Sequence, residues 1–127
     1  MKRLLFFIAL VTINLSCHKE EQIIYSSDLI GEWEWLSTCG GFSGGCGTPQ
    51  TTNSTAKIIF SQDSVIYNFQ NNAFVSSNEF SILRTPVDYT FGLLLIDSRH
   101  YLYSIIHDTL NFMPEGADFS SSYKRIK

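Results

Sequence analysis

The residues Gly41-Phe42-Ser43-Gly44-Gly45 match the G-x-S-x-G motif, in which a hydrolase presents its nucleophilic serine on a sharp turn between a buried strand and a helix. The next ten residues, Cys46 to Thr55, are mostly glycine, threonine, proline and asparagine, which do not favour a helix. We therefore expect no helix after Ser43 and no nucleophilic serine.

Two histidines, His100 and His107, lie close in sequence to Asp97 and Asp108. Imidazole and carboxylate groups together can bind a metal or transfer protons. All four residues fall at predicted hairpin turns, where polar side chains are generally solvated. We expect neither a metal site nor a cofactor here, and with the unsuitable context of Ser43 we expect no enzymatic activity.

The N-terminus has the features of an export signal. Lys2 and Arg3 precede an apolar run from Leu4 to Ile13, and the segment ends in Asn14-Leu15-Ser16-Cys17. A run of this length is too short to span a bilayer, because a spanning helix needs about 20 apolar residues. The sequence predicts three parts: a signal peptide over 1–16, a tether over 17–27 and one folded domain over 28–127.

Ser16-Cys17 resembles the end of a bacterial lipobox, which is cut before a cysteine that then carries lipid. The resemblance implies that Cys17 is the lipidated residue, with palmitate among its acyl chains, and that the protein is anchored in the outer membrane through this lipid. The next residues, His18-Lys19-Glu20-Glu21, resemble the export tag of surface lipoproteins of Bacteroidetes. The alternative is an ordinary charged, solvated tether, so exposure on the cell surface stays open.

Cysteine count then favours a disulfide. If Cys17 carries lipid, Cys39 and Cys46 remain as an even pair in an oxidising compartment. Their bond would close a loop of about eight residues and stabilise the fold by about 2.5 kcal/mol. A metal site would need further ligands, and none lies nearby in sequence.

Charge and composition limit the partners. Loss of Lys2 and Arg3 with the signal changes the formal net charge from −3 to −5, and no cluster of Lys and Arg remains. Binding to nucleic acid is therefore not expected, because phosphate recognition needs such a cluster. A small domain also needs large apolar side chains or staples to be stable, and this one is rich in Phe, Tyr and Trp.

The domain alternates short apolar runs with turn residues, which is typical of an all-β fold. Trp33 and Trp35 alternate with glutamates, which places both indoles on one face of a strand. Asn71-Asn72 suits a two-residue hairpin turn. A single turn of helix is expected near Ser26–Ile30, and a long loop without regular structure over Thr38–Thr55. Eight strands are predicted, over 31–37, 56–60, 65–70, 74–84 with a break at 76–77, 89–96, 101–107, 109–113 and 119–126.

Eight antiparallel strands of this length form either a closed barrel or a sandwich. The stretch Leu-Ile-Gly-Glu-Trp-Glu-Trp over 29–35, the glycine-rich loop, the hairpins and the terminal Tyr-Lys-Arg-Ile over 123–126 resemble the small lipocalin-like lipoproteins of Bacteroidetes, which have a calycin-type barrel. The resemblance implies an up-and-down barrel. Gly31-x-Trp33 is similar to the G-x-W motif of lipocalins, which implies that Trp33 closes one end of the barrel under Arg125.

The predicted barrel interior leaves two functions open. Inward aromatic residues would either line a pocket for a small apolar ligand or fill the barrel completely, in which case the Cys39–Cys46 loop would be presented to a protein partner as a binding or inhibitor module. The candidates for ligand contact are Trp33, Trp35, Phe60, Phe80 and Phe112; further inward residues are expected at Ile58, Ile82, Leu102 and Leu110.

Three further surface features are predicted. The run Phe91–Ile96 is apolar on both faces, so its outer side would be covered by the long loop, the tether or a partner, and burial of Leu94 within one chain would contradict a partner surface there. Asp63-Ser64-Val65 and Asp108-Thr109-Leu110 resemble the Asp-(Ser/Thr)-aliphatic acceptor for O-glycosylation in Bacteroidetes. Ser64 and Thr109 are therefore candidate glycosylation sites.

Overall fold

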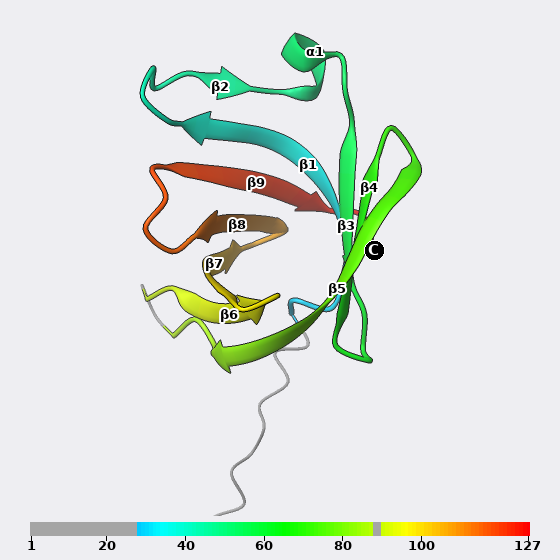
Figure 1. Ribbon diagram of the computed structural model, residues 1–127, viewed down its shortest axis with the longest axis vertical. Coiled ribbons are helices and arrows are strands. Elements are labelled where there is room, and N and C mark those ends of the chain that lie inside the picture. The colour runs from blue at the N-terminus through cyan, green and yellow to red at the C-terminus, as the bar shows by residue number, and fades with distance from the viewer. Residues whose placement is uncertain (1–27, 88–89) are drawn as a thin grey trace, which may run out of the picture.

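The computed structural model describes residues 28–87 and 90–127. The predictions for the signal peptide, for the tether and for Cys17 lie outside these residues. The described chain is almost entirely β-structure (Figure 1), and its elements are β1 (Gly31–Gly40), β2 (Cys46–Gly47), α1 (Pro49–Thr52), β3 (Ala56–Phe60), β4 (Val65–Gln70), β5 (Ala73–Arg84), β6 (Gly92–Ile96), β7 (Arg99–Ile106), β8 (Thr109–Pro114) and β9 (Phe119–Arg125).

Eight of these strands form a closed antiparallel barrel, as predicted. Each strand pairs with its neighbour in the order β1-β3-β4-β5-β6-β7-β8-β9, and β9 pairs back with β1. In Figure 1, β1, β9, β8, β7 and β6 lie one below another, with β3, β4 and β5 beside them. Closure pairs both edges of the sheet, which removes open strands that would invite aggregation. The sandwich alternative is thereby excluded.

The hairpin turns follow local sequence. Asn71 and Asn72 connect β4 and β5 with φ values of 49° and 62°, and Asp97 and Ser98 connect β6 and β7 with φ values of 46° and 63°. Two successive positive φ values are the requirement of the turn whose twist matches a hairpin, and Asn and Asp tolerate them well. Short polar pairs therefore set the register of the strands on either side.

The region over 38–55 is more regular than predicted. β1 continues to Gly40, and β2 pairs with its end, so that Cys39 lies opposite Cys46. The expectation of no helix in this stretch was wrong by one turn, because Thr48 caps α1 and Pro49 occupies its first turn. The single helical turn expected near Ser26–Ile30 is wrong for its described part, where Asp28 and Leu29 form a plain turn.

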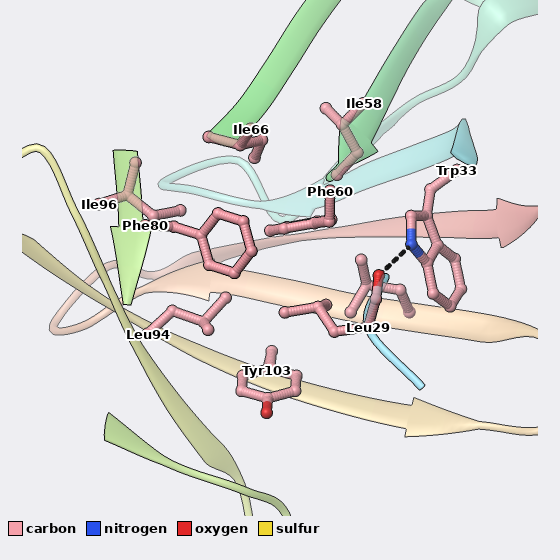
Figure 2. Close-up of a cluster of buried hydrophobic side chains, with 10 residues drawn as sticks. Leu29, Trp33, Ile58, Phe60, Ile66, Phe80, Leu94, Ile96 and Tyr103 are labelled. Atoms are coloured by element: carbon pink, nitrogen blue, oxygen red, sulfur yellow. Dashed lines mark hydrogen bonds between the residues drawn. The ribbon is translucent and has the colours of Figure 1, made fainter. Parts of the chain in front are cut away.

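The interior of the barrel is an apolar core. Its buried side chains come from every barrel strand except β9 and from the turn before β1, and they are Leu29, Trp33, Ile58, Phe60, Ile66, Phe80, Leu94, Ile96, Tyr103 and Leu110. Figure 2 shows Phe60, Leu94 and Leu29 pointing into the same interior. One predicted inward residue is misplaced: Leu102 pairs with Leu93 and Met113, between the inward neighbours Tyr101 and Tyr103, so it faces outward.

Candidate functional site

One end of the barrel is closed by Trp33. Its side chain has no exposed surface, and its Nε1 donates a hydrogen bond to the carbonyl of Leu29 at 2.9 Å, which Figure 2 marks. The guanidinium of Arg125 lies over the Trp33 ring, with 4.2 Å between its central carbon and the ring centroid. Arg125 also donates to the carbonyl of Ile30 at 3.1 Å and to the carbonyl of Asp28. We call Leu29, Trp33, Phe60 and Arg125 the closed end.

The glycine that precedes this tryptophan by two residues has a steric role. Gly31 has a φ of +144°, and a Cβ placed on it would lie 2.4 Å from the carbonyl oxygen of Lys127 and 2.9 Å from Nη1 of Arg125. A side chain would therefore collide with the last residue of the chain and with the arginine that covers Trp33. The glycine of the G-x-W motif is therefore required by the close contact between the start of β1 and the residues that follow β9.

A second set of inward side chains keeps accessible surface. It comes from β1, β7, β8 and β9, its members are partly exposed, and we call it the accessible wall: Trp35, Thr38, Tyr101, Phe112, Ser121 and Tyr123. Their register places them together, because Trp35 is opposite Tyr123, Thr38 is opposite Ser121, and Ser121 is opposite Phe112. The rings of Tyr101 and Phe112 stack with centroids 4.8 Å apart and planes within 3°.

Hydrogen bonds link the polar groups of the accessible wall. Nε1 of Trp35 donates to the hydroxyl of Thr38 at 3.0 Å, and the hydroxyls of Thr38 and Ser121 are 2.7 Å apart. Burial raises the pKa of the Tyr123 hydroxyl above its usual value near 10, although its hydrogen bond with Ser121 lowers the pKa in part. The wall thus combines aromatic faces with hydroxyl groups and carries no charge, which suits an apolar molecule that bears a neutral polar group.

The five aromatic residues expected to contact a ligand divide between these two regions. Trp33 and Phe60 lie at the closed end, and Phe80 packs edge-to-face on Phe60 with centroids 5.2 Å apart. Those three side chains are buried among other core residues. Trp35 and Phe112 lie on the accessible wall and keep partial exposure.

Sequence reasoning missed the rest of the accessible wall. Tyr101 and Tyr123 were recognised as strand residues, but not as inward aromatic residues beside Phe112. The signal for Tyr123 was present, since it is two residues from Arg125 and therefore on the same strand face. Thr38 lay in a predicted loop, and Ser121 lies within three successive serines that show no alternation.

A second exposed feature lies on the loop between β1 and β2. Cys39 and Cys46 form the predicted disulfide, with their Cα atoms 4.1 Å apart. Phe42 lies at the tip of the enclosed loop with its side chain fully exposed, at 110% of the reference area. The loop is also held by backbone hydrogen bonds from Gly40 to Gly45 at 3.0 Å and from Gly41 to Asp118 at 3.0 Å. An apolar ring is therefore presented on an ordered loop.

The remaining candidates for chemistry are dispersed. Ser43 lies exposed in the disulfide loop, and β2 separates it from α1. His100 and His107 lie at opposite ends of β7, about 23 Å apart at the rise of a strand. His100 instead faces Glu115, with 3.4 Å between Nδ1 and Oε2. No group of three or more His, Cys, Asp or Glu side chains suited to a metal occurs in the part of the chain that the structure describes.

The expected partner surface on Phe91–Ile96 is corrected by the structure. Leu94 has no exposed surface and points into the barrel, where Ile82 lies opposite it on β5. The outer side of β6 carries Leu93 and Leu95, which are only partly exposed. A strand that is apolar throughout gave no indication of which residues face inward.

The candidate glycosylation residues lie at or next to turns, and Thr109 belongs to a strand rather than to the turn where it was expected. Ser64 is the last residue of the β3–β4 turn and Thr109 is the first residue of β8, and both side chains are partly exposed. Whether they carry sugar stays a prediction.

Comparison with known proteins adds no relative. No protein-family model matches the sequence, and no curated protein matches it significantly. Across residues 28–87 and 90–127, no helix is long and apolar enough to cross a membrane. The closed eight-stranded barrel is compatible with a lipocalin-like, calycin-type fold. Because neither comparison provides a relative, any functional conclusion must come from the residues of the barrel.

Proposed function

We propose that this protein is a lipid-anchored, outer-membrane lipoprotein whose lipocalin-like barrel binds a small apolar molecule at the accessible wall and catalyses no reaction. The observation that carries the proposal is the partial exposure of inward aromatic residues such as Trp35 and Phe112, beside fully buried core residues such as Trp33. The part of such a ring that stays exposed is available to a ligand, and this holds also for Phe112, whose ring packs in part against the core.

Ligand binding is tested with the uncharged fluorescent probe N-phenyl-1-naphthylamine and the mature chain. We expect Trp35→Ala to weaken probe binding several-fold, because the indole contributes to the accessible wall. Phe74→Ala is the matched control, since Phe74 is an exposed aromatic residue that packs against Phe69 on the outer face of the barrel. Equal affinity of the two variants for the probe would contradict binding at the accessible wall.

The anchor is tested by the intact mass of the protein purified from its own host without denaturation. A mass that corresponds to residues 17–127 plus acyl chains on Cys17 is expected, less the two hydrogen atoms that are lost in the disulfide between Cys39 and Cys46. An unmodified chain that keeps a free thiol at Cys17 would exclude the lipid anchor. A co-purifying mass that is lost on denaturation would report the class of the ligand directly.

The alternative function is supported by Phe42. A fully exposed aromatic ring on a loop closed by a disulfide is suited to insertion into a partner protein, because the loop loses little conformational freedom on binding. In that case Phe42→Ser would abolish capture of a host protein, whereas Trp35→Ala would leave capture unchanged. The two variants therefore separate a ligand carrier from a protein-binding module.

A further inference from the structure

Both ends of the barrel domain meet at one end of the barrel. In an up-and-down barrel successive connections alternate between the two ends. The end where β1 starts therefore also carries the β3–β4, β5–β6 and β7–β8 connections and the end of β9. The amide of Ile126 donates to the carbonyl of Glu32 at 2.9 Å, which confirms that the C-terminus lies beside the start of β1. We call this end the tether end, because the chain leading to Cys17 joins it at Asp28.

Exposed apolar side chains lie around the tether end. Leu83, Phe91, Ile106 and Ile126 have exposed fractions of 50%, 44%, 61% and 45%, and we call these four the tether-end rim. Large apolar side chains that remain this exposed in the folded chain are available to bind an apolar surface.

Hydrogen bonds and strand pairings connect the tether-end rim to the point where the tether begins. Nε of Arg84 donates to the carbonyl of Phe91 at 3.1 Å, which ties the end of β5, where Leu83 lies, to the residues just before β6. Gly92 pairs with Tyr103, so Phe91 and Ile106 lie at the same end of β6 and β7.

The same path continues from β7 to the tether. Ile106 pairs with Thr109, and the amide of Arg125 donates to the carbonyl of Asp108 at 2.8 Å. The guanidinium of Arg125 in turn binds the carbonyl of Asp28. The part of the rim formed by Ile106 and Ile126 therefore lies near Asp28, the first described residue of the domain.

The length of the tether limits how far this end can be from a membrane. Asp28 follows Cys17 by eleven positions, and a fully extended chain of that length spans at most about 40 Å. Leu29 is fully buried in the barrel, so the tether starts from a fixed point. A lipid on Cys17 would hold the tether end toward the bilayer and the opposite end away from it.

From this placement we propose that the tether-end rim is a membrane-contact surface, which rests on the bilayer that the lipid of Cys17 enters. This inference rests on the proposed lipid anchor and extends it, because it assigns an orientation: the tether end faces the lipid, and the Cys39–Cys46 loop, at the opposite end, faces away. Several apolar side chains inserted together would add to the affinity of one lipid anchor.

The proposal is tested by the depth of added tryptophans in a bilayer. The mature chain with a free Cys17 is coupled to a maleimide lipid in phosphatidylcholine vesicles, so that anchoring does not depend on acylation in the host. Phe91→Trp and Ile106→Trp each place an indole on the rim. Phe74→Trp is the matched control, since Phe74 is 59% exposed beside the β4–β5 turn at the opposite end. Emission is compared in vesicles with and without brominated acyl chains, after subtraction of the unsubstituted protein.

We expect brominated lipid to quench the indoles at 91 and 106 several-fold more strongly than the indole at 74. Equal quenching at all three positions, or none at 91 and 106, would overturn the proposal. A blue shift at 91 that rises with protein concentration without vesicles would assign the rim to a second copy of the chain instead. Sugar on Thr109, which is opposite Ile106, would also exclude close contact with lipid. An unacylated Cys17 in the host would refute the anchor but would leave the quenching result interpretable.

Discussion

The closed end and the accessible wall are built from the same strands, yet their side chains are used differently. Trp33 and Trp35 are two residues apart on β1 and both face inward, but Trp33 is completely buried and Trp35 is not. Trp33 donates its hydrogen bond to a backbone carbonyl and is covered by Arg125, whereas Trp35 donates to the hydroxyl of Thr38. The comparison shows that facing inward does not by itself make a barrel residue part of the core.

The largest expected effect separates these two tryptophans. Trp33→Ala should lower the free energy of unfolding by about 3–5 kcal/mol, because it removes a large buried ring and leaves the guanidinium of Arg125 without its aromatic partner. Trp35→Ala should cost about 1 kcal/mol, because its ring is already partly exposed. Urea unfolding of the two variants measures the difference. If both lose the same stability, the distinction between the two regions is wrong.

The next largest effect is expected from a substitution at Gly92 on β6, where an added Cβ would disturb the core. A Cβ on Gly92 would lie 2.3 Å from the ring of Tyr103, so Gly92→Ala should cost about 1–3 kcal/mol through overpacking. Gly45→Ala is the control, since the nearest atom to a Cβ there is the Ser43 hydroxyl at 3.8 Å. Thermal unfolding compares the two variants. A second change, Tyr103→Leu, should restore part of the loss at position 92, and failure to do so would place the strain elsewhere.

A smaller effect is expected from Arg125→Lys. Lysine keeps the positive charge over Trp33 but cannot reach the carbonyls of Ile30 and Asp28 with two separate donors. We expect a loss of about 1–2 kcal/mol, close to the net value of hydrogen bonds made by a charged group. Urea unfolding measures it, and binding of the naphthylamine probe should not change. A large loss of probe binding with full stability would show that the closed end also takes part in the site.

The smallest expected effect is a dependence of stability on alkaline pH, which arises from Tyr123 of the accessible wall. Burial raises the pKa of Tyr123 in the folded chain, so the neutral hydroxyl is favoured there. Its contribution to stability is complete below the unfolded pKa near 10 and is lost as pH rises above 10 toward the folded pKa. Tyr123→Phe should therefore lose less stability than the unsubstituted protein between pH 9 and pH 11, about 1 kcal/mol at most. Tyr67→Phe, on the outer face, is the control, and identical slopes for both variants would contradict the role of burial.

Much of the fold could be predicted from local sequence. The alternation around Trp33 and the asparagine pair at 71–72 specified a strand and a turn, because each depends only on adjacent residues. The number of barrel strands followed from the spacing of such signals, whereas the barrel itself, rather than a sandwich, was implied by the resemblance to lipocalin-like proteins. The two cysteines of the β1–β2 loop were paired correctly, on the expectation that lipid on Cys17 would leave neither of them another partner.

The errors arose where apolar and polar residues did not alternate along a strand. Phe91–Ile96 is apolar at nearly every position, so its inward residues are fixed only by pairing, through Gly92 under the ring of Tyr103. Leu102 was assigned to the interior for the same reason, since both of its neighbours are also apolar. In the β1–β2 region the many glycines and threonines show no apolar–polar alternation, so the strands could not be predicted. The disulfide and the pairing of β1 with β9 hold this region in regular structure.

The candidate site was less predictable than the core. The inward aromatic residues could be proposed individually from sequence, but their division into a closed end and an accessible wall depends on which of them Leu29 and Arg125 cover. Arg125 reaches back 95 positions to the carbonyl of Ile30. Contacts across that separation leave no periodic signal in the chain, so the wall emerges only from the folded arrangement.

The seam between β1 and β9 also sets an order for folding. It joins the first and last strands of the barrel, and the hydroxyls of Thr38 and Ser121 that meet across it are 83 positions apart. Every other pair of neighbouring barrel strands is adjacent or nearly adjacent in the chain, and pairings of that kind form sooner because they close shorter loops. A nascent chain that ends before Phe119 would contain the hairpins but would leave two sheet edges unpaired. We therefore expect completion of the last strand to be the step that pairs both edges of the sheet and closes the barrel.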